Sequence, residues 1–383
     1  MTTPPILDQE PADQRRFGDE ADEARGIGVA ALRFGAALVV PILSFVALWL
    51  TFEFLRNTEA NRLIVVTVAV LVGVVGVWLL YWGMDLVINQ LPDHVAAGIR
   101  PAVFVGPAIV VLSVYLVYPA INTFLISFKE GDDFVWFKNY GTIFTNSSYL
   151  VSIRNSILWV IVVPAVAVAV GLAFSVLADK LGKRSESIAK SLIFLPMAIS
   201  FVGASIVWRF IYSFRPPGFG EQIGLLNGIW SGLLGNEPIA WLLQEPWNNL
   251  YLMIILIWLQ TGFAMVILSS AIKAVPDDLL EAARIDGATE WQVFWRVVFP
   301  SISSTIVVVT TTIVITVWKV FDIVWVMTGG KFGTSVIAER MITEFFLFRN
   351  AGIGAALAVI LFIAVIPIMI INVRKFRQQE AAR

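Results

Sequence analysis

The chain contains the stretch Glu281-Ala282-Ala283-Arg284-Ile285-Asp286-Gly287 and, nine residues later, Val297-Val298-Phe299-Pro300. Long hydrophobic stretches flank this polar segment on both sides. A polar segment in such a position joins two membrane-spanning helices. The expected fold is therefore a helical membrane bundle with an amphipathic loop at residues 276–300.

The first half of this loop predicts a short helix. Pro276-Asp277-Asp278 is a helix start, because proline and acidic residues favour the positive end of the helix dipole. Small Ala282 and Ala283 allow close approach of a partner, and Gly287 supplies a backbone conformation that other residues adopt only at a cost. A bulky side chain at these positions should block docking.

The second half predicts another short helix, from about Thr289 to Val298. Helical spacing turns Trp291, Phe294 and Trp295 onto one face. The loop is thus amphipathic, and the next span starts at Pro300.

The spacing E-A-A-x3-G-x9-V-x-F-P resembles the coupling loop of ABC importer permeases, with Val297 and Phe299 where that family prefers isoleucine and leucine. The resemblance implies two short helices at about a right angle that dock into a cleft of a separate ATP-hydrolysing subunit. It also implies that Glu281 pairs with an arginine of that partner. The residues expected to couple to the ATPase are Glu281, Ala282, Ala283, Asp286, Gly287 and Pro300. An amphipathic loop without a partner is the alternative.

Composition predicts an all-α integral membrane protein, because 58% of the residues are hydrophobic, 14% are charged and the mean hydropathy is +0.81. A span needs about twenty apolar residues, and its backbone groups must bond within the span, so each span is a helix. About eight transmembrane helices are expected. They lie at residues 33–53, 63–83, 101–127, 155–178, 188–212, 248–272, 302–328 and 353–373.

These spans divide the chain into parts. We expect a disordered cytosolic tail at residues 1–28, two peripheral N-terminal helices with an inner loop at 29–100, a six-helix permease core at 101–373, and a cytosolic tail at 374–383. The positive-inside rule then places both termini in the cytoplasm. We expect a multi-pass protein of a prokaryotic plasma membrane. Two short clusters support this topology: Lys180, Lys183, Arg184 and Lys190 at one inner turn, and Arg374, Lys375 and Arg377 after the last span.

Several functional motifs are missing from the sequence. No G-x-x-x-x-G-K-S/T run exists, so the chain is not expected to hydrolyse ATP, and ATP and Mg should bind to the partner ATPase. No catalytic motif is present, and a chain with no cysteine and one histidine predicts no metal site. We expect a transporter subunit rather than an enzyme, with membrane lipid around it and no nucleic-acid partner.

Polar groups inside spans are costly and mark candidate transport residues. Trp258, Gln260 and Phe263 combine aromatic faces with a polar group, as sugar recognition requires. The following span offers Thr316, Lys319 and Asp322. On one helix face Lys319 and Asp322 would form an ion pair, or they would contact the substrate directly.

The core, residues 101–373, resembles carbohydrate-uptake permeases of the maltose type. Phe194-Leu195-Pro196-Met197-Ala198, Trp258-Leu259-Gln260-Thr261-Gly262-Phe263 and Lys319-Val320-Phe321-Asp322 are most similar to the alpha-glucoside branch. The resemblance implies sugar contacts at Leu259, Gln260 and Phe263, whereas Val317 and Val320 replace asparagines of the maltose type. It further implies a heterodimer with a second permease, two ATP-binding subunits and an extracytoplasmic solute-binding protein.

The leading interpretation is a permease that imports a sugar, such as maltose, trehalose or sucrose, by alternating access. Another solute, a polyol or glycerol phosphate, is the alternative within transport. A stand-alone carrier that uses an ion through Lys319 and Asp322 is the alternative from another class. The outer loop at residues 213–247 is either a docking surface for the binding protein or a plug in the membrane surface.

Overall fold

The computed structural model describes residues 39, 42–43, 45–58, 61–89 and 93–381. The tail predicted at residues 1–28 and the beginning of the span predicted at 33–53 lie outside the described residues. The remainder of that span is helical at residues 45–57. The chain divides into two compact units, Met1–Pro119 and Ala120–Arg383.

The first unit contains two long helices, α2 (Arg62–Ile88) and α3 (Asp93–Leu112), followed by the π-helix η1 (Ser113–Val117). Asn61 caps α2 through a 3.0 Å hydrogen bond from the Leu63 amide. The Tyr81 hydroxyl donates to the Phe104 carbonyl, so α2 and α3 are joined by a polar contact as well as by stacked rings. Most apolar side chains of α2 are exposed, which suits a helix surrounded by lipid.

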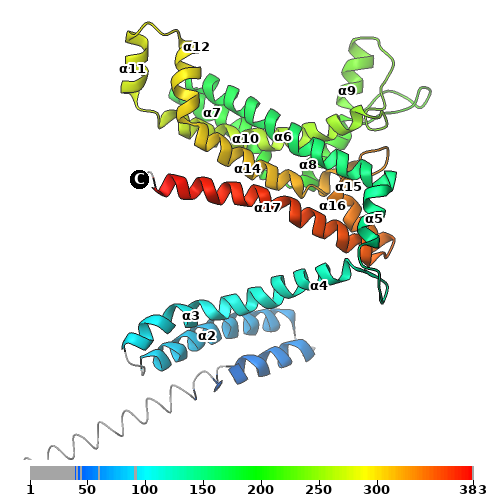
Figure 1. The fold of residues 1–383 in the computed structure, drawn as a ribbon. Helices are drawn as coiled ribbons and strands as arrows, with labels where there is room; N and C mark the ends of the chain where they lie inside the picture. Colours follow the sequence, from blue (N-terminus) through cyan, green and yellow to red (C-terminus); the bar gives the residue numbers. More distant parts are fainter. Residues whose placement is uncertain (1–38, 40–41, 44, 59–60, 90–92, 382–383) are drawn as a thin grey trace, which may run out of the picture. The chain divides into compact units, whose positions relative to one another are not determined.

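The second unit is a helical bundle with one small antiparallel ladder, in which Lys129 pairs with Phe134 (Figure 1). Its first elements are the end of α4 (Tyr118–Ile126), β1 (Lys129–Glu130), β2 (Asp133–Phe134), α5 (Lys138–Thr145), α6 (Ser147–Asp179), α7 (Lys183–Phe194), the 3-10 helix η2 (Leu195–Ala198) and α8 (Phe201–Ile211). Next come α9 (Leu225–Asn227), η3 (Gly228–Leu233), α10 (Trp247–Lys273), α11 (Asp277–Ile285), α12 (Glu290–Val293), η4 (Phe294–Val298) and α13 (Phe299–Ser301). The last are α14 (Ser303–Trp318), α15 (Asp322–Met327), α16 (Ile337–Ile342), η5 (Thr343–Leu347) and α17 (Ala351–Ala381).

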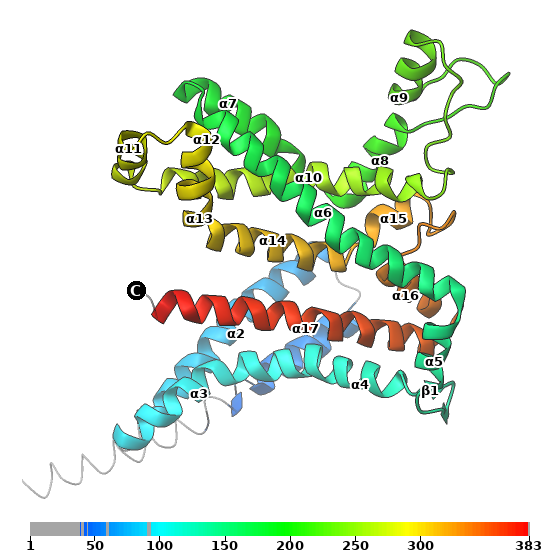
Figure 2. The same cartoon turned by 45° about the horizontal axis from the view of Figure 1, so that its top comes forward.

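Helix α10 forms the centre of the bundle and packs along α6, with α14 beside both (Figure 2). Leu252, Leu256 and Leu268 of α10 are fully buried, as is Trp159 of α6. The indole of Trp159 donates to the Asn249 side-chain oxygen at 3.4 Å. The core therefore lies between α6 and α10 and includes a polar contact.

Five helices of the described residues are long and apolar enough to cross a membrane, or up to seven if each of two bent pairs is one span. The bent pairs are Lys183–Ala198 with Phe201–Ile211, at 102°, and Glu290–Ser301 with Ser303–Trp318, at 66°. This count agrees roughly with the predicted eight, and the predicted all-α membrane fold is confirmed.

The single helix predicted over residues 302–328 is wrong. Helix α14 ends at Trp318, and α15 begins at Asp322. Neither glycine nor proline marks this break, but the Trp318 indole donates to the Leu361 carbonyl of α17 at 3.0 Å. Val317 in the last turn of α14 and Val320 just before α15 are both buried in the core, which holds the chain in place on either side of Lys319. Tertiary contacts therefore override the local apolar pattern.

Amide side chains hold the turn that follows α15. The Asn155 amide of α6 donates to the carbonyls of Gly333 and Ser335 at 2.7 and 2.9 Å, and the Asn249 amide of α10 donates to Gly333 at 3.1 Å. Nearby, the buried Glu339 carboxylate accepts hydrogen bonds from the Ser335 and Thr343 hydroxyls. These bonds satisfy irregular backbone that would otherwise be costly within a membrane protein.

A glycine in α6 permits the closest approach of the two central helices. A Cβ atom at Gly171 would lie 2.7 Å from the Ala264 Cβ atom and 2.9 Å from the Met265 amide nitrogen. We predict that Gly171→Ala lowers the free energy of unfolding by about 1–3 kcal/mol through overpacking. Gly141→Ala in α5 is the matched control, because nothing lies within 4 Å of its added Cβ. Thermal unfolding of both purified variants in detergent is the measurement, and equal midpoints would contradict the assignment of close packing to Gly171.

Candidate functional site

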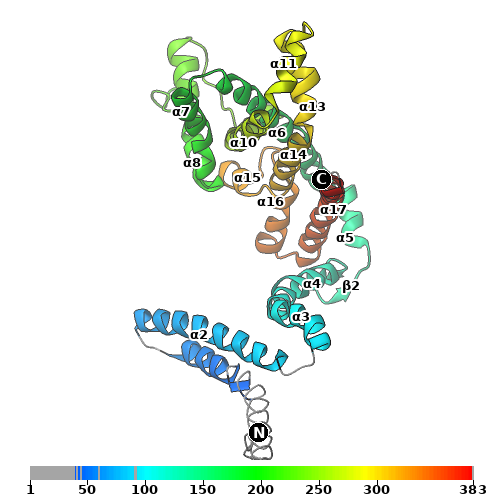
Figure 3. The same ribbon diagram turned by 90° about the vertical axis from the view of Figure 1, so that its left-hand side faces the viewer.

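A cavity of about 250 Å³ opens between α10, α14 and the bend that joins α7 to α8. Figure 3 shows α8, α10 and α14 next to one another in the bundle. The cavity is lined by Met197, Phe201, Leu259, Gln260, Phe263, Thr312 and Thr316. None of these lining residues is charged, so the cavity is neutral.

The bend between α7 and α8 brings Met197 and Phe201 to the cavity. Ile199 and Ser200 are extended, and the Ser200 hydroxyl caps α8 by accepting a hydrogen bond from the Gly203 amide at 3.1 Å. On the other side, Gly262 of α10 packs directly on the chain of α7. A Cβ atom at Gly262 would lie 2.5 Å from the Ile193 carbonyl oxygen.

The polar groups of the cavity suit hydroxyl groups of a substrate. The hydroxyls of Thr312 and Thr316 donate to backbone carbonyls one turn earlier, at 2.9 and 3.0 Å, and retain lone pairs that accept hydrogen bonds. Gln260 is 8% exposed, and no other group in the described part of the chain hydrogen-bonds its amide. A buried amide needs partners. A bound solute with several hydroxyl groups would supply both donors and acceptors.

Four residues predicted to contact substrate meet in this cavity, namely Leu259, Gln260, Phe263 and Thr316. Trp258 does not line the cavity. Its ring packs edge-on against that of Trp208 at 5.8 Å. Met197, Phe201 and Thr312 were missed, although Thr312 lies one helical turn before Thr316 and shares its face.

Lys319 and Asp322 also lie outside the lining of the cavity. Lys319 is the exposed residue that ends α14, whereas half-buried Asp322 starts α15. The expectation that they share one helix face is wrong, because the helix breaks between them. Among the residues that the structure describes, no ion pair joins the two side chains.

The loop predicted at residues 276–300 contains short helices that project from one end of the bundle (Figure 1). Helix α11 follows Pro276, and α12 begins after Thr289 with a capping box formed with Gln292. Between them Gly287 has a φ of +83°, a conformation that favours glycine. We call residues 276–300 the coupling segment.

The coupling segment is exposed over most of its length. Glu281, Ala282, Asp286, Gly287 and Pro300 are exposed and Ala283 is half-buried. Two apolar side chains are also largely in solvent, Ile285 at 85% and Trp291 at 71% exposure. Such apolar exposure outside the membrane spans indicates a surface for another protein.

An ion pair joins the two arms of the coupling segment. The Arg284 guanidinium donates to both carboxylate oxygens of Glu290, at 2.8 and 3.3 Å. The Glu290 carboxylate raises the pKa of Arg284. The rings of Trp291 and Trp295 add an edge contact at 5.6 Å. The Arg284–Glu290 ion pair therefore braces the turn at Gly287, and the ring contact stiffens the second arm.

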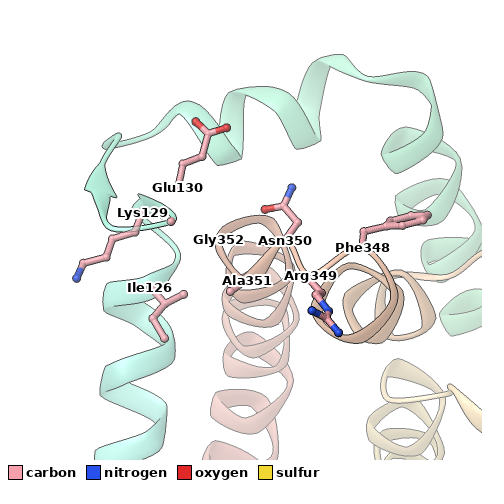
Figure 4. Close-up of a pocket in the computed structure, with 9 residues that line it drawn as sticks. Ile126, Lys129, Glu130, Phe348, Arg349, Asn350, Ala351 and Gly352 are labelled. Carbon is pink, nitrogen blue, oxygen red and sulfur yellow. The ribbon is translucent and has the colours of Figure 1, made fainter.

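A second cavity, of about 340 Å³, lies where β1 meets the start of α17 (Figure 4). In that view the Lys129 side chain extends away from Asn350 and Arg349. No convergent set of polar side chains fills this cavity. Across the described chain, no group of three or more His, Cys, Asp or Glu residues is placed to hold a metal ion.

Known proteins resemble this chain in both sequence and fold. The osmoprotective compounds uptake permease protein GgtC of Synechocystis sp. is 54% identical over 282 residues, which is 73% of this chain and 100% of that protein. The alpha-glucoside transport system permease protein AglF of Rhizobium meliloti is 44% identical over 338 residues, covering 84% of this chain and 99% of that protein.

The fold is similar to that of a solved chain from a bacterial ABC transporter involved in alginate import, with a TM-score of 0.64 and 20% identity over 74% of this chain and 99% of that chain. Residues 171–375 match the model of one family, the binding-protein-dependent transport system inner membrane component. This region contains all the residues that line the cavity and the whole coupling segment. The chain belongs to this family of ABC transporter permeases.

Proposed function

We propose that the chain is the permease subunit of an ATP-binding cassette importer that moves a neutral alpha-glucoside, such as maltose, trehalose or sucrose. The observation that carries this proposal is the uncharged cavity, in which Gln260, Thr312 and Thr316 stand beside the rings of Phe201 and Phe263. Aromatic faces cover the apolar faces of a sugar ring, and the polar groups bind its hydroxyls. The name of the relative AglF, an alpha-glucoside transport system permease protein, supports the same substrate class.

Glycerol phosphate fits the cavity less well. Proteins bind phosphate groups with arginine, lysine or helix N-termini, because a buried double negative charge must be compensated. The lining contains no cation. An ion-coupled carrier is disfavoured as well, because Lys319 and Asp322 neither line the cavity nor pair with each other.

The coupling segment supports a partner that hydrolyses ATP. Its exposed apolar side chains and its braced turn suit insertion into a cleft, with Glu281 paired to an arginine there. We propose a heterodimer with a second permease, two ATP-binding subunits that hold ATP and Mg, and an extracytoplasmic solute-binding protein. Both termini would be cytoplasmic. Closure of the ATPase pair would move the coupling segments and open the cavity outward.

We predict that Gln260→Ala weakens substrate recognition, since it removes hydrogen bonds from a buried site. The substrate concentration that half-stimulates ATP hydrolysis should rise about threefold to tenfold. Assembly with the ATPase should be unchanged, because Gln260 is far along α10 from the coupling segment. Asn57→Ala, which removes an exposed amide in the helix at residues 45–57, is the control. An unaltered concentration dependence would remove Gln260 from the site.

A second prediction concerns the turn of the coupling segment. Gly287→Val should abolish co-purification of the ATPase and substrate uptake, because valine resists a φ of +83° and adds bulk to the docking surface. Gly131→Val is the matched control, with a φ of +63° in the β1–β2 turn and nothing within 4 Å of its added Cβ. The two variants have comparable backbone strain. If both retained the ATPase, docking through this turn would be refuted.

The substrate class is tested by purification of the tagged chain from its native membrane. We expect an ATPase to co-purify, and ATP hydrolysis to rise with one of maltose, trehalose or sucrose when the binding protein is added. Stimulation by glycerol phosphate alone would overturn the proposed substrate. Uptake driven by an ion gradient with the purified chain alone would overturn the proposed class.

A further inference from the structure

A network of charged side chains links three helices beside the coupling segment. The Glu186 side chain of α7 is 11% exposed. It accepts a hydrogen bond from Lys190, one turn later, and forms an ion pair with Lys273 at the end of α10. The Lys273 ammonium also lies 3.6 Å from a carboxylate oxygen of Asp179, the last residue of α6. Glu186 therefore connects α7 to α10 directly and to α6 through Lys273.

Lys190 adds a second link between α7 and α10. Its ammonium donates to the Ser269 hydroxyl of α10 at 2.5 Å, and its side chain is 21% exposed. In the sequence Lys190 belongs to a basic cluster that marks an inner turn. In the fold it faces neighbouring helices and neutralises Glu186. Partly buried charges that satisfy one another in this way fix the relative position of the elements that carry them.

The network is placed between the coupling segment and the cavity. Helix α10 ends at Lys273, and α11 begins at Asp277. In the other direction α7 leads into η2 and α8, which supply Met197 and Phe201 to the cavity. Helix α10 itself supplies Gln260. A movement of the coupling segment thus reaches one cavity wall along α10 and the opposite wall through Glu186 and α7.

Close packing also joins α7 and α10 at a point further from the coupling segment. The Gly262 contact with Ile193 leaves no room for even a methyl group between α10 and α7. This close packing holds the middle of the helix pair by van der Waals attraction. The charged network supplies attraction at the end of the pair that is nearest to the coupling segment.

We propose that Glu186 is a positioning residue that makes α7 follow α10 when the coupling segment moves, so that both cavity walls change position together. This proposal rests on the proposed function as an ATP-driven importer. It assigns to Glu186 the transmission of movement, not contact with substrate or with the ATPase. Loss of the carboxylate should therefore separate ATP hydrolysis from transport.

The test uses the complete transporter in proteoliposomes. With Glu186→Gln, the amount of sugar moved per ATP hydrolysed should fall about fivefold or more, while the ATPase still co-purifies. Glu53→Gln, at an exposed position in the helix at residues 45–57, is the control. Lys273→Gln removes the ion pairs of Lys273 with Glu186 and with Asp179 but keeps the Glu186–Lys190 pair, and since Lys273 is 48% exposed this variant is expected to assemble even if the first does not. A normal ratio of transport to hydrolysis in Lys273→Gln or Glu186→Gln would overturn the proposal.

Spin labels give an independent measurement, because the chain has no cysteine. Labels at Ile188→Cys on α7 and Ser270→Cys on α10 occupy exposed positions. In the wild-type transporter, the distance between the two labels should stay constant when nucleotide is trapped. In Glu186→Gln, the distribution of this distance should broaden. The exchange E186K/K190E restores the opposite-charge pair within α7 but places an ammonium beside Lys273 of α10, so coupling should stay impaired. If wild-type complexes never move sugar, the proposed function fails, whereas the label distances still decide whether Glu186 ties α7 to α10.

Discussion

The rest of the structure depends on the close contact of α10 with its neighbours. In a membrane the apolar surfaces of helices gain little by leaving lipid, so association relies on close packing and on hydrogen bonds between helices. Gly171 of α6 and the α10 residue Gly262 each let backbone approach backbone at distances that a Cβ atom would prevent. The indole of Trp159 adds a polar contact to Asn249 within the same interface. With α10 held in this way, Leu259, Gln260 and Phe263 have fixed positions on the cavity wall.

Helix α10 also connects the cavity to the coupling segment. Its middle forms the cavity, and its end leads within a few residues into the coupling segment. The segment itself is an exposed, braced turn, in which the Arg284–Glu290 ion pair and the left-handed Gly287 fix the direction of α11 relative to α12. A surface ion pair contributes little to stability. Here it restricts a turn that must keep one shape for a partner to recognise it.

Sequence patterns predicted the elements that local chemistry decides. Pro276, Gly287 and the position of Thr289 gave the helices of the coupling segment. The residue types of Gln260 and Phe263, together with the resemblance to maltose-type permeases that added Leu259, gave one wall of the cavity. The second wall depends on a 102° bend at Ile199 and Ser200, and the break at Lys319 depends on contacts of Trp318 with α17. Pro196 marks the end of α7, but the proline alone does not give the angle of the bend or the position of Met197 and Phe201 beside the cavity, so these two residues were missed. The break at Lys319 has no local signal of glycine or proline, and Lys319 and Asp322 were therefore assigned to one helix face in error.

The hydrogen bonds from the Asn155 and Asn249 amides to the turn after α15 have a consequence for the biogenesis of the protein. Asn155 and Asn249 lie on α6 and α10, but the carbonyls that they bind, of Gly333 and Ser335, are synthesised much later. Until then these amides lack their native partners, and water or other polar groups must satisfy them. Insertion of α6 and α10 therefore precedes closure of this end of the bundle, which waits for the C-terminal quarter of the chain. A ribosome that stalls before residue 333 leaves a helical bundle with an open polar end, which membrane quality control can recognise.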